Sequence, residues 1–153
     1  MLSYELEHIV TFSGQGGGAP EFIGQVPEGI RINFRNQGGS FAGPRMRGKL
    51  RDFGGDWMTV RQDGIGPVDA RVTFETEDGA LILVQYSGII DLGEQGFAAF
   101  LHGKLPERAS IRMSPRFYAS HPDYTWLNRL HCLGIGEFHQ AARTASYDVY
   151  AVR

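Results

Sequence analysis

The sequence predicts an all-β protein folded as a single antiparallel barrel. Glycine accounts for 21 of the 153 residues and proline for 7, and such residues in a helix interior cost about 1 and 3 kcal/mol relative to alanine. Several segments alternate apolar and polar residues with a period of two, which is typical of half-buried strands. No segment is long enough for the helical crossover that parallel strands need. We therefore expect roughly eight to ten strands and at most one short helix.

The first third of the chain contains two alternating segments. Residues 4–13 place aromatic and aliphatic side chains on one side, which predicts a strand. Residues 14–20, with the sequence GQGGGAP, have no periodicity and predict a mobile loop. Residues 29–36 alternate again and end at the pair Gly38 and Gly39.

The middle third predicts two hairpins. Residues 47–53 and 56–62 are separated by Gly54 and Gly55, so we expect two strands joined at this pair. Residues 68–76 and 80–90 flank Asp78 and Gly79, the strongest short-range hairpin signal in the chain. These two segments should pair antiparallel.

The last third predicts four more strands, at residues 97–101, 110–119, 126–138 and 146–152. Residues 127–132 fit a helical turn equally well, because their apolar positions match both spacings. No repeat of 20 to 50 residues is present, which argues against a propeller or solenoid. The whole chain, residues 1–153, is thus expected to form one closed, lipocalin-like barrel domain.

Composition excludes several classes of protein. The net charge of -2 arises from 15 basic and 17 acidic residues scattered along the chain, so we expect no nucleic-acid partner. The longest apolar run, residues 80–84, is too short for a membrane helix. A single cysteine and an N-terminal segment without signal-peptide features predict a soluble, cytoplasmic protein that does not bind membranes. Exposed edge strands leave a homodimer open.

Common cofactor and metal motifs are missing. There is no phosphate-binding loop, nucleophile elbow, zinc-protease motif or cysteine pair, and the glycines at 14–18 do not open a helix. The five histidines are scattered, so we expect no metal and no cofactor. Cys132 is expected to be a buried, inert thiol.

Charged residues on two central strands form the candidate catalytic group. Alternation sends Asp56 to one face of its strand and Trp57 to the other. If the face of Asp56 is the inside of a closed sheet, the carboxylate is either paired or part of a ligand site. Asp69 and Arg71 share a face, either a functional one or a solvated outer one. Register decides whether these groups converge.

A second group of candidates lies near residue 126. Tyr124, Trp126 and Asn128 project to the same side if this segment is extended. They would then form a pocket wall, with apolar surface from the rings and orientation from the amide. The alternative is that Trp126 fills the core and Asn128 closes a turn.

The order of these motifs resembles the DUF3237 family, also called UPF0311. The resemblance rests on GGDW at 54–57, the pair Asp69 and Arg71, DGA at 78–80 and WLN at 126–128, and runs from about Tyr4 to the C-terminus. It implies a small antiparallel β-barrel whose signature positions are Asp56, Trp57, Asp69, Arg71, Trp126 and Asn128. Family members often carry Phe-Glu-Thr before WLN, whereas Phe117 is followed here by Tyr118 and Ala119.

These observations predict a small-molecule-binding barrel that acts as a cofactor-free acid–base lyase, isomerase or hydratase on an oxygenated organic metabolite. Asp56 or Asp69 would move the proton, and Arg71 would hold an oxyanion or keep a carboxylate ionised. The substrate would contact Trp57, Tyr124, Trp126 and Asn128. The alternative is a noncatalytic, lipocalin-like carrier or sensor of a hydrophobic small molecule.

Overall fold

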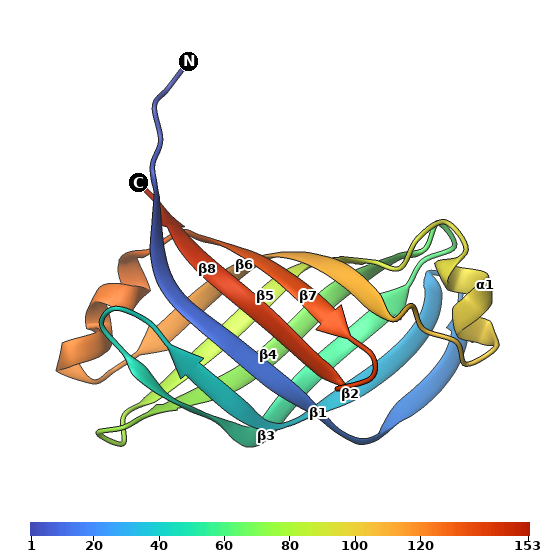
Figure 1. Ribbon diagram of the computed structural model, residues 1–153, viewed down its shortest axis with the longest axis horizontal. Coiled ribbons are helices and arrows are strands. Elements are labelled where there is room, and N and C mark those ends of the chain that lie inside the picture. The colour runs from blue at the N-terminus through green and yellow to red at the C-terminus, as the bar shows by residue number, and fades with distance from the viewer.

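Eight antiparallel strands form a closed barrel in the computed structural model, which describes residues 1–153 (Figure 1). Each strand pairs with the next along the chain, and the last closes on the first. The strands are β1 (Leu6–Val26), β2 (Gly29–Ala42), β3 (Arg47–Val60), β4 (Ile65–Thr76), β5 (Leu81–Asp91), β6 (Arg108–Ala119), β7 (Cys132–His139) and β8 (Thr144–Val152). The predicted fold class is therefore confirmed.

Two short helices lie at opposite ends of the barrel (Figure 1). Helix α1 (Gly96–Leu101) follows β5, and the 3₁₀ helix η1 (Pro122–Arg129) follows β6. The strand predicted at residues 97–101 was wrong, and the segment predicted as a strand from residue 126 begins with η1. Pro122 in the first turn and Asp123 beside it favour this helix start. No helix has the length and apolar character that crossing a bilayer requires.

The barrel interior is filled by the inward side chains of the alternating strands. Burial alternates at every residue of β6 and at nearly every residue of β4, as the period of two predicts. Aromatic rings occupy the middle of the barrel, where Phe12 stacks on Tyr147 at 4.6 Å and Phe41 on Phe74 at 4.2 Å between centroids. The hairpin predicted at Asp78 and Gly79 is confirmed by the β4–β5 register.

The glycine-rich segment at residues 14–20 belongs to β1 and is not a loop. It pairs with β2 through shifts in register after Gly14 and after Gly17. Gly39 on β2 has φ of 146°, and a Cβ atom there would lie 1.9 Å from the carbonyl oxygen of Ser13. Glycine allows the two backbones to approach this closely, so the segment forms a bulged strand.

The pair Gly54 and Gly55 is likewise a bulge and not a turn. Strand β3 runs without a break through both residues, and its register with β4 shifts between Leu50 and Gly54. Gly54 has φ of 94°, and a Cβ atom there would lie 2.1 Å from the carbonyl oxygen of Arg71. The predicted hairpin at this point was wrong, because glycine's freedom serves a bulge inside one strand.

Helix η1 is held against β6 by Asn128. Its side-chain oxygen accepts the N–H of Ala119 at 2.8 Å, and its amide nitrogen donates to the Ala119 carbonyl at 2.8 Å. Replacing Asn128 with alanine should lower the free energy of unfolding by about 2 kcal/mol, since both bonds are lost. Urea denaturation would measure this loss, with the neighbouring exposed Arg129→Ala as control. Equal stability of the two variants would show that the Asn128 hydrogen bonds do not stabilise the fold.

Candidate active site

Asp56 points into the barrel from β3. It lies opposite Phe34 of β2 and Ala70 of β4, and one carboxylate oxygen accepts the backbone N–H of Asp69 at 3.0 Å. Burial raises the pKa of Asp56 from 3.8 to about 6, although the Asp69 N–H opposes the shift, and the Asp69 charge adds to it. A carboxyl group with this pKa exchanges protons readily near neutral pH.

Two tyrosines from distant strands accompany this carboxylate. Tyr86 on β5 and Tyr147 on β8 are buried, and their ring centroids lie 5.6 Å apart. Burial is the main cause that raises the pKa of each phenol, and the charge of Asp56 raises both further. Both hydroxyls therefore stay protonated near neutral pH and are able to donate hydrogen bonds.

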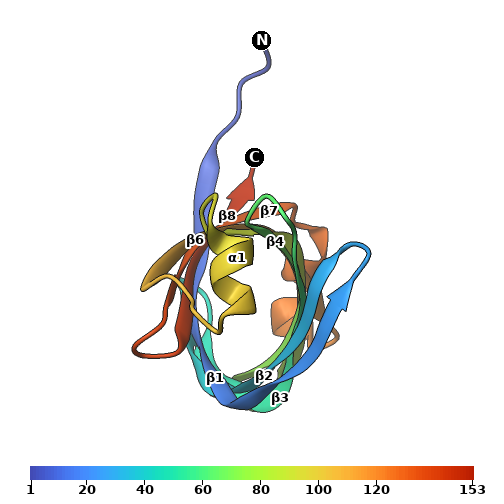
Figure 2. The ribbon, with the colours of Figure 1, turned by 90° about the vertical axis from the view of Figure 1, so that its right-hand side faces the viewer.

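These groups line a cavity of about 120 Å³ that opens to solvent; we call it the internal cavity because its lining includes inward side chains of the barrel. Its apolar walls include the rings of Phe12, Phe34 and Phe138. A second, outer cavity of about 260 Å³ adjoins it and shares Phe34, Phe138 and Arg143. We call this outer cavity the vestibule; it lies at the end of the barrel that carries α1, which Figure 2 shows face on.

Asp69 and Arg71 do not converge with Asp56. In the β3–β4 register Asp56 lies opposite Ala70, and Arg71 lies opposite Gly55. Asp56 therefore leaves one face of the sheet, whereas Asp69 and Arg71 leave the other. The sequence left open whether the three groups converge, and this register places Asp69 and Arg71 outside the cavity that Asp56 lines. Asp69 contributes its backbone N–H to the site, and its charge adds to the raised pKa of Asp56, but its side chain does not line the cavity.

Trp57 also lies on the outer face of the barrel. The guanidinium of Arg71 lies 5.6 Å from the centre of the Trp57 ring and 3.1 Å from the carboxylate of Asp69. All three side chains reach solvent. This group is a surface cluster, and it does not contact the internal cavity.

Tyr124, Trp126 and Asn128 lie on η1, at the end of the barrel opposite α1. Trp126 stacks under Arg45, whose guanidinium carbon lies 4.0 Å from the ring centre. The Tyr124 hydroxyl donates to the carboxylate of Asp78 at 3.0 Å. None of these three residues lines the internal cavity, so the predicted pocket wall instead closes one end of the barrel.

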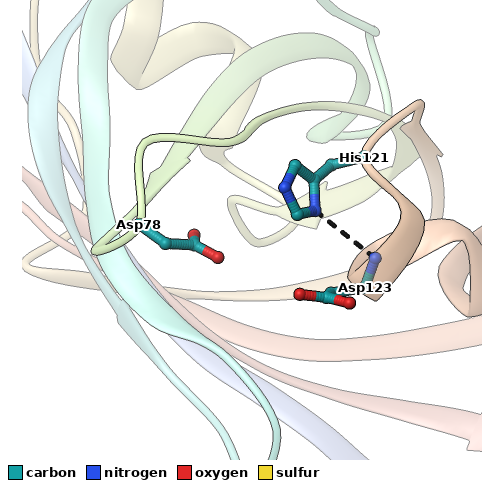
Figure 3. Close-up of side chains that lie close together, drawn as sticks. All are labelled: Asp78, His121 and Asp123. Carbon is teal, nitrogen blue, oxygen red and sulfur yellow. Dashed lines mark hydrogen bonds between the residues drawn. The ribbon is translucent and has the colours of Figure 1, made fainter.

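Asp78, His121 and Asp123 form an exposed cluster at the same end (Figure 3). One potential ligand atom from each lies within 4.8 Å of the others. Two of these side chains already have partners: Asp78 accepts hydrogen bonds from Thr76 and Tyr124, and His121 Nδ1 accepts the Asp123 N–H at 3.3 Å. These bonds tie the β4–β5 turn to η1 and account for the proximity of the three residues.

Cys132 takes no part in either cluster. It is buried on β7, and burial raises the pKa of its thiol to about 11. The thiol is therefore uncharged near neutral pH, as expected for a packing residue.

Sequence reasoning missed the two tyrosines and Arg143. The signal for Tyr86 was present, because alternation over residues 80–90 places it on the same face as Ile82 and Val84. Tyr147 shares its face with Val149 in the same way. No sequence signal shows that these two faces meet at Asp56, since β3, β5 and β8 converge only when the barrel closes.

Comparison with known proteins agrees with this fold. A UPF0311 protein from Rhodopseudomonas palustris is 29% identical over 150 residues, which cover 97% of this chain and 96% of that protein. A crystal structure described as a beta-barrel like protein from Acinetobacter baumannii superposes with a TM-score of 0.81 at 27% identity and covers 100% and 98% of the two chains. A structure described as an enzyme from Penicillium herquei matches with a TM-score of 0.69 at 21% identity and covers 100% and 97%.

The sequence profile of the family described as DUF3237, protein of unknown function, matches residues 4–152. This span includes every strand of the barrel and the site around Asp56. The chain therefore belongs to the DUF3237 family.

Proposed function

We propose that this protein is an acid–base enzyme that needs no cofactor and acts on a small oxygenated organic molecule inside the barrel. The observation that carries this proposal is the position of Asp56. Its carboxyl group, with a pKa of about 6, lies on the wall of an apolar cavity near two protonated phenols.

The reaction that suits this arrangement begins with removal of a proton from a carbon next to a carbonyl group. Ionised Asp56 accepts the proton, and the electron pair of the C–H bond moves to the carbonyl oxygen. The hydroxyls of Tyr86 and Tyr147 donate hydrogen bonds to this oxygen, where preorganised donors are most effective. Asp56 then returns the proton to another carbon, giving isomerisation, or to a leaving hydroxyl group, giving elimination of water.

The apolar walls support this proposal in two ways. The rings of Phe12, Phe34 and Phe138 provide surface for an organic substrate. They also shield part of Asp56 from water, which raises its basicity. One protein with the same fold is described as an enzyme, which is compatible with chemistry inside such a barrel.

A carrier for a hydrophobic molecule would use the same cavity, but it would have no use for this carboxyl group. Burial of an ionised carboxylate costs stability, and asparagine would fill the same volume without that cost. The buried Asp56 therefore favours the enzyme over the carrier.

The proposal is tested by deuterium exchange into a carbon acid. The protein is incubated in heavy water with β-tetralone, whose acidic C–H groups lie beside a carbonyl on a two-ring apolar body, and exchange is followed by NMR. We expect catalysed exchange with a rate that rises with pH and levels off above about pH 6, because only ionised Asp56 accepts a proton.

Asp69→Asn is the matched control, since it removes a surface carboxylate and leaves the backbone N–H that holds Asp56. At pH 8, where Asp56 is ionised in both proteins, this variant should exchange at about the wild-type rate. A barrel that binds β-tetralone but catalyses no exchange at any pH would support the carrier instead.

A further inference from the structure

Two arginines line the vestibule, and one of them has no carboxylate partner. The ionisable side chains that line it are Arg35 and Arg143, and the inner cavity adds only Asp56 and the two tyrosines. The chain as a whole has a net charge of -2. Arg35 is paired with Asp52, so the uncompensated positive charge at the entrance of the apolar cavity is that of Arg143, and it favours an anionic ligand.

Arg143 is the freer of these two cations. Arg35 forms an ion pair with Asp52 at 3.0 Å. Arg143 has no carboxylate partner, and its guanidinium donates to the backbone carbonyl of Gly18. Its remaining N–H groups are available to a ligand, and a guanidinium binds a carboxylate well through two parallel hydrogen bonds.

The backbone holds Arg143 at the entrance. It is the one residue other than glycine with positive φ, at 52°. The carbonyl of Arg143 accepts the N–H of Gly16 at 2.9 Å, and the Gln15 side chain donates to the carbonyl of Ala142 at 2.9 Å. These bonds fasten the β7–β8 turn to β1, and a backbone conformation of this kind persists where its surroundings hold it.

We propose that Arg143 binds the carboxylate of the substrate, and that the substrate is an organic acid with a planar, apolar body. Its ring would lie between Phe34 and Phe138, which line both cavities. Its far end would then reach Asp56 and the two tyrosines. This inference rests on the proposed function, because it assigns the substrate class of the same site.

Two probes of similar shape test this inference. Naphthoate carries a carboxylate, whereas naphthylmethanol replaces it with a neutral hydroxymethyl group, and calorimetry measures the binding of each. Wild-type protein should bind naphthoate about tenfold more tightly or better, and salt should weaken naphthoate binding only. Arg143→Gln should remove this preference and leave the affinity for naphthylmethanol unchanged.

Arg143→Lys keeps the positive charge and should retain part of the preference for naphthoate over naphthylmethanol. Arg116→Gln removes an exposed arginine from β6 outside both cavities and serves as the charge-matched control. Equal affinity for the two probes, no saturable binding of naphthoate, or the same loss in Arg116→Gln would overturn the proposal. Binding needs no turnover, so this result is independent of the exchange assay, which tests Asp56 and the two tyrosines.

Discussion

Replacing Asp56 with asparagine should remove catalysis and stabilise the fold at the same time. The amide cannot accept the substrate proton, so the exchange rate with β-tetralone should fall by about a thousandfold, within the range for general acid–base groups. Its oxygen still accepts the Asp69 N–H, which keeps the local structure. A structural role alone would instead predict lower stability.

The gain in stability should depend on pH. The pKa of Asp56 is about 6 in the folded protein and 3.8 in the unfolded chain, so the folded state binds more protons between these values. The contribution of Asp56 to stability is fully present below about pH 4 and is lost as pH rises through about 6. Above that pH the asparagine variant should be more stable than wild type by about 3 kcal/mol at most.

Urea denaturation at pH 4 and pH 8 would measure this difference, with Asp69→Asn and Arg71→Ala as surface controls. At pH 8 both controls should retain wild-type exchange, because their side chains lie outside the barrel and Asp56 is ionised. If the asparagine variant catalyses deuterium exchange into β-tetralone at the wild-type rate, Asp56 is not the catalytic base. The stability gained by the asparagine variant over wild type should be larger at pH 8 than at pH 4. A smaller gain at pH 8 would contradict the raised pKa of Asp56.

Replacing Tyr86 or Tyr147 with phenylalanine should slow exchange by about a hundredfold each, since loss of one oxyanion donor typically costs this much. The rings remain, so stacking of Tyr147 on Phe12 and packing between the two tyrosines are preserved. The double variant should lose less than the product of the two single effects, because both hydroxyls act on the same oxygen.

The pH profile of exchange distinguishes hydrogen bonding to the oxyanion from an indirect effect of the hydroxyls on the pKa of Asp56. Removing either hydroxyl should leave the apparent pKa of exchange near 6, since burial is the main cause of the shift at Asp56. Tyr150→Phe offers a control on β8, outside the internal cavity. If the Tyr86 and Tyr147 variants match this control in rate, the phenols do not stabilise the oxyanion.

Much of the barrel was predictable from the sequence, because strand alternation and turn chemistry are local properties. The Asp78–Gly79 hairpin follows from its turn residues, and the inward direction of Asp56 follows from its parity with Met58 and Val60. The glycines misled, since residues 14–20, expected to form a loop, and the pair at 54 and 55, expected to form a turn, are bulges inside strands. A bulge and a turn require the same backbone freedom, so composition alone does not separate them.

By itself, then, the sequence determined a closed antiparallel barrel and the side chains that share a strand face with Asp56. Only the tertiary structure decided that Tyr86 and Tyr147 join Asp56 inside, while Asp69 and Arg71 face solvent outside. The physical reason is register: a shift of one residue between neighbouring strands exchanges the inner and outer faces, and long-range pairing around the closed sheet selects which side chains meet.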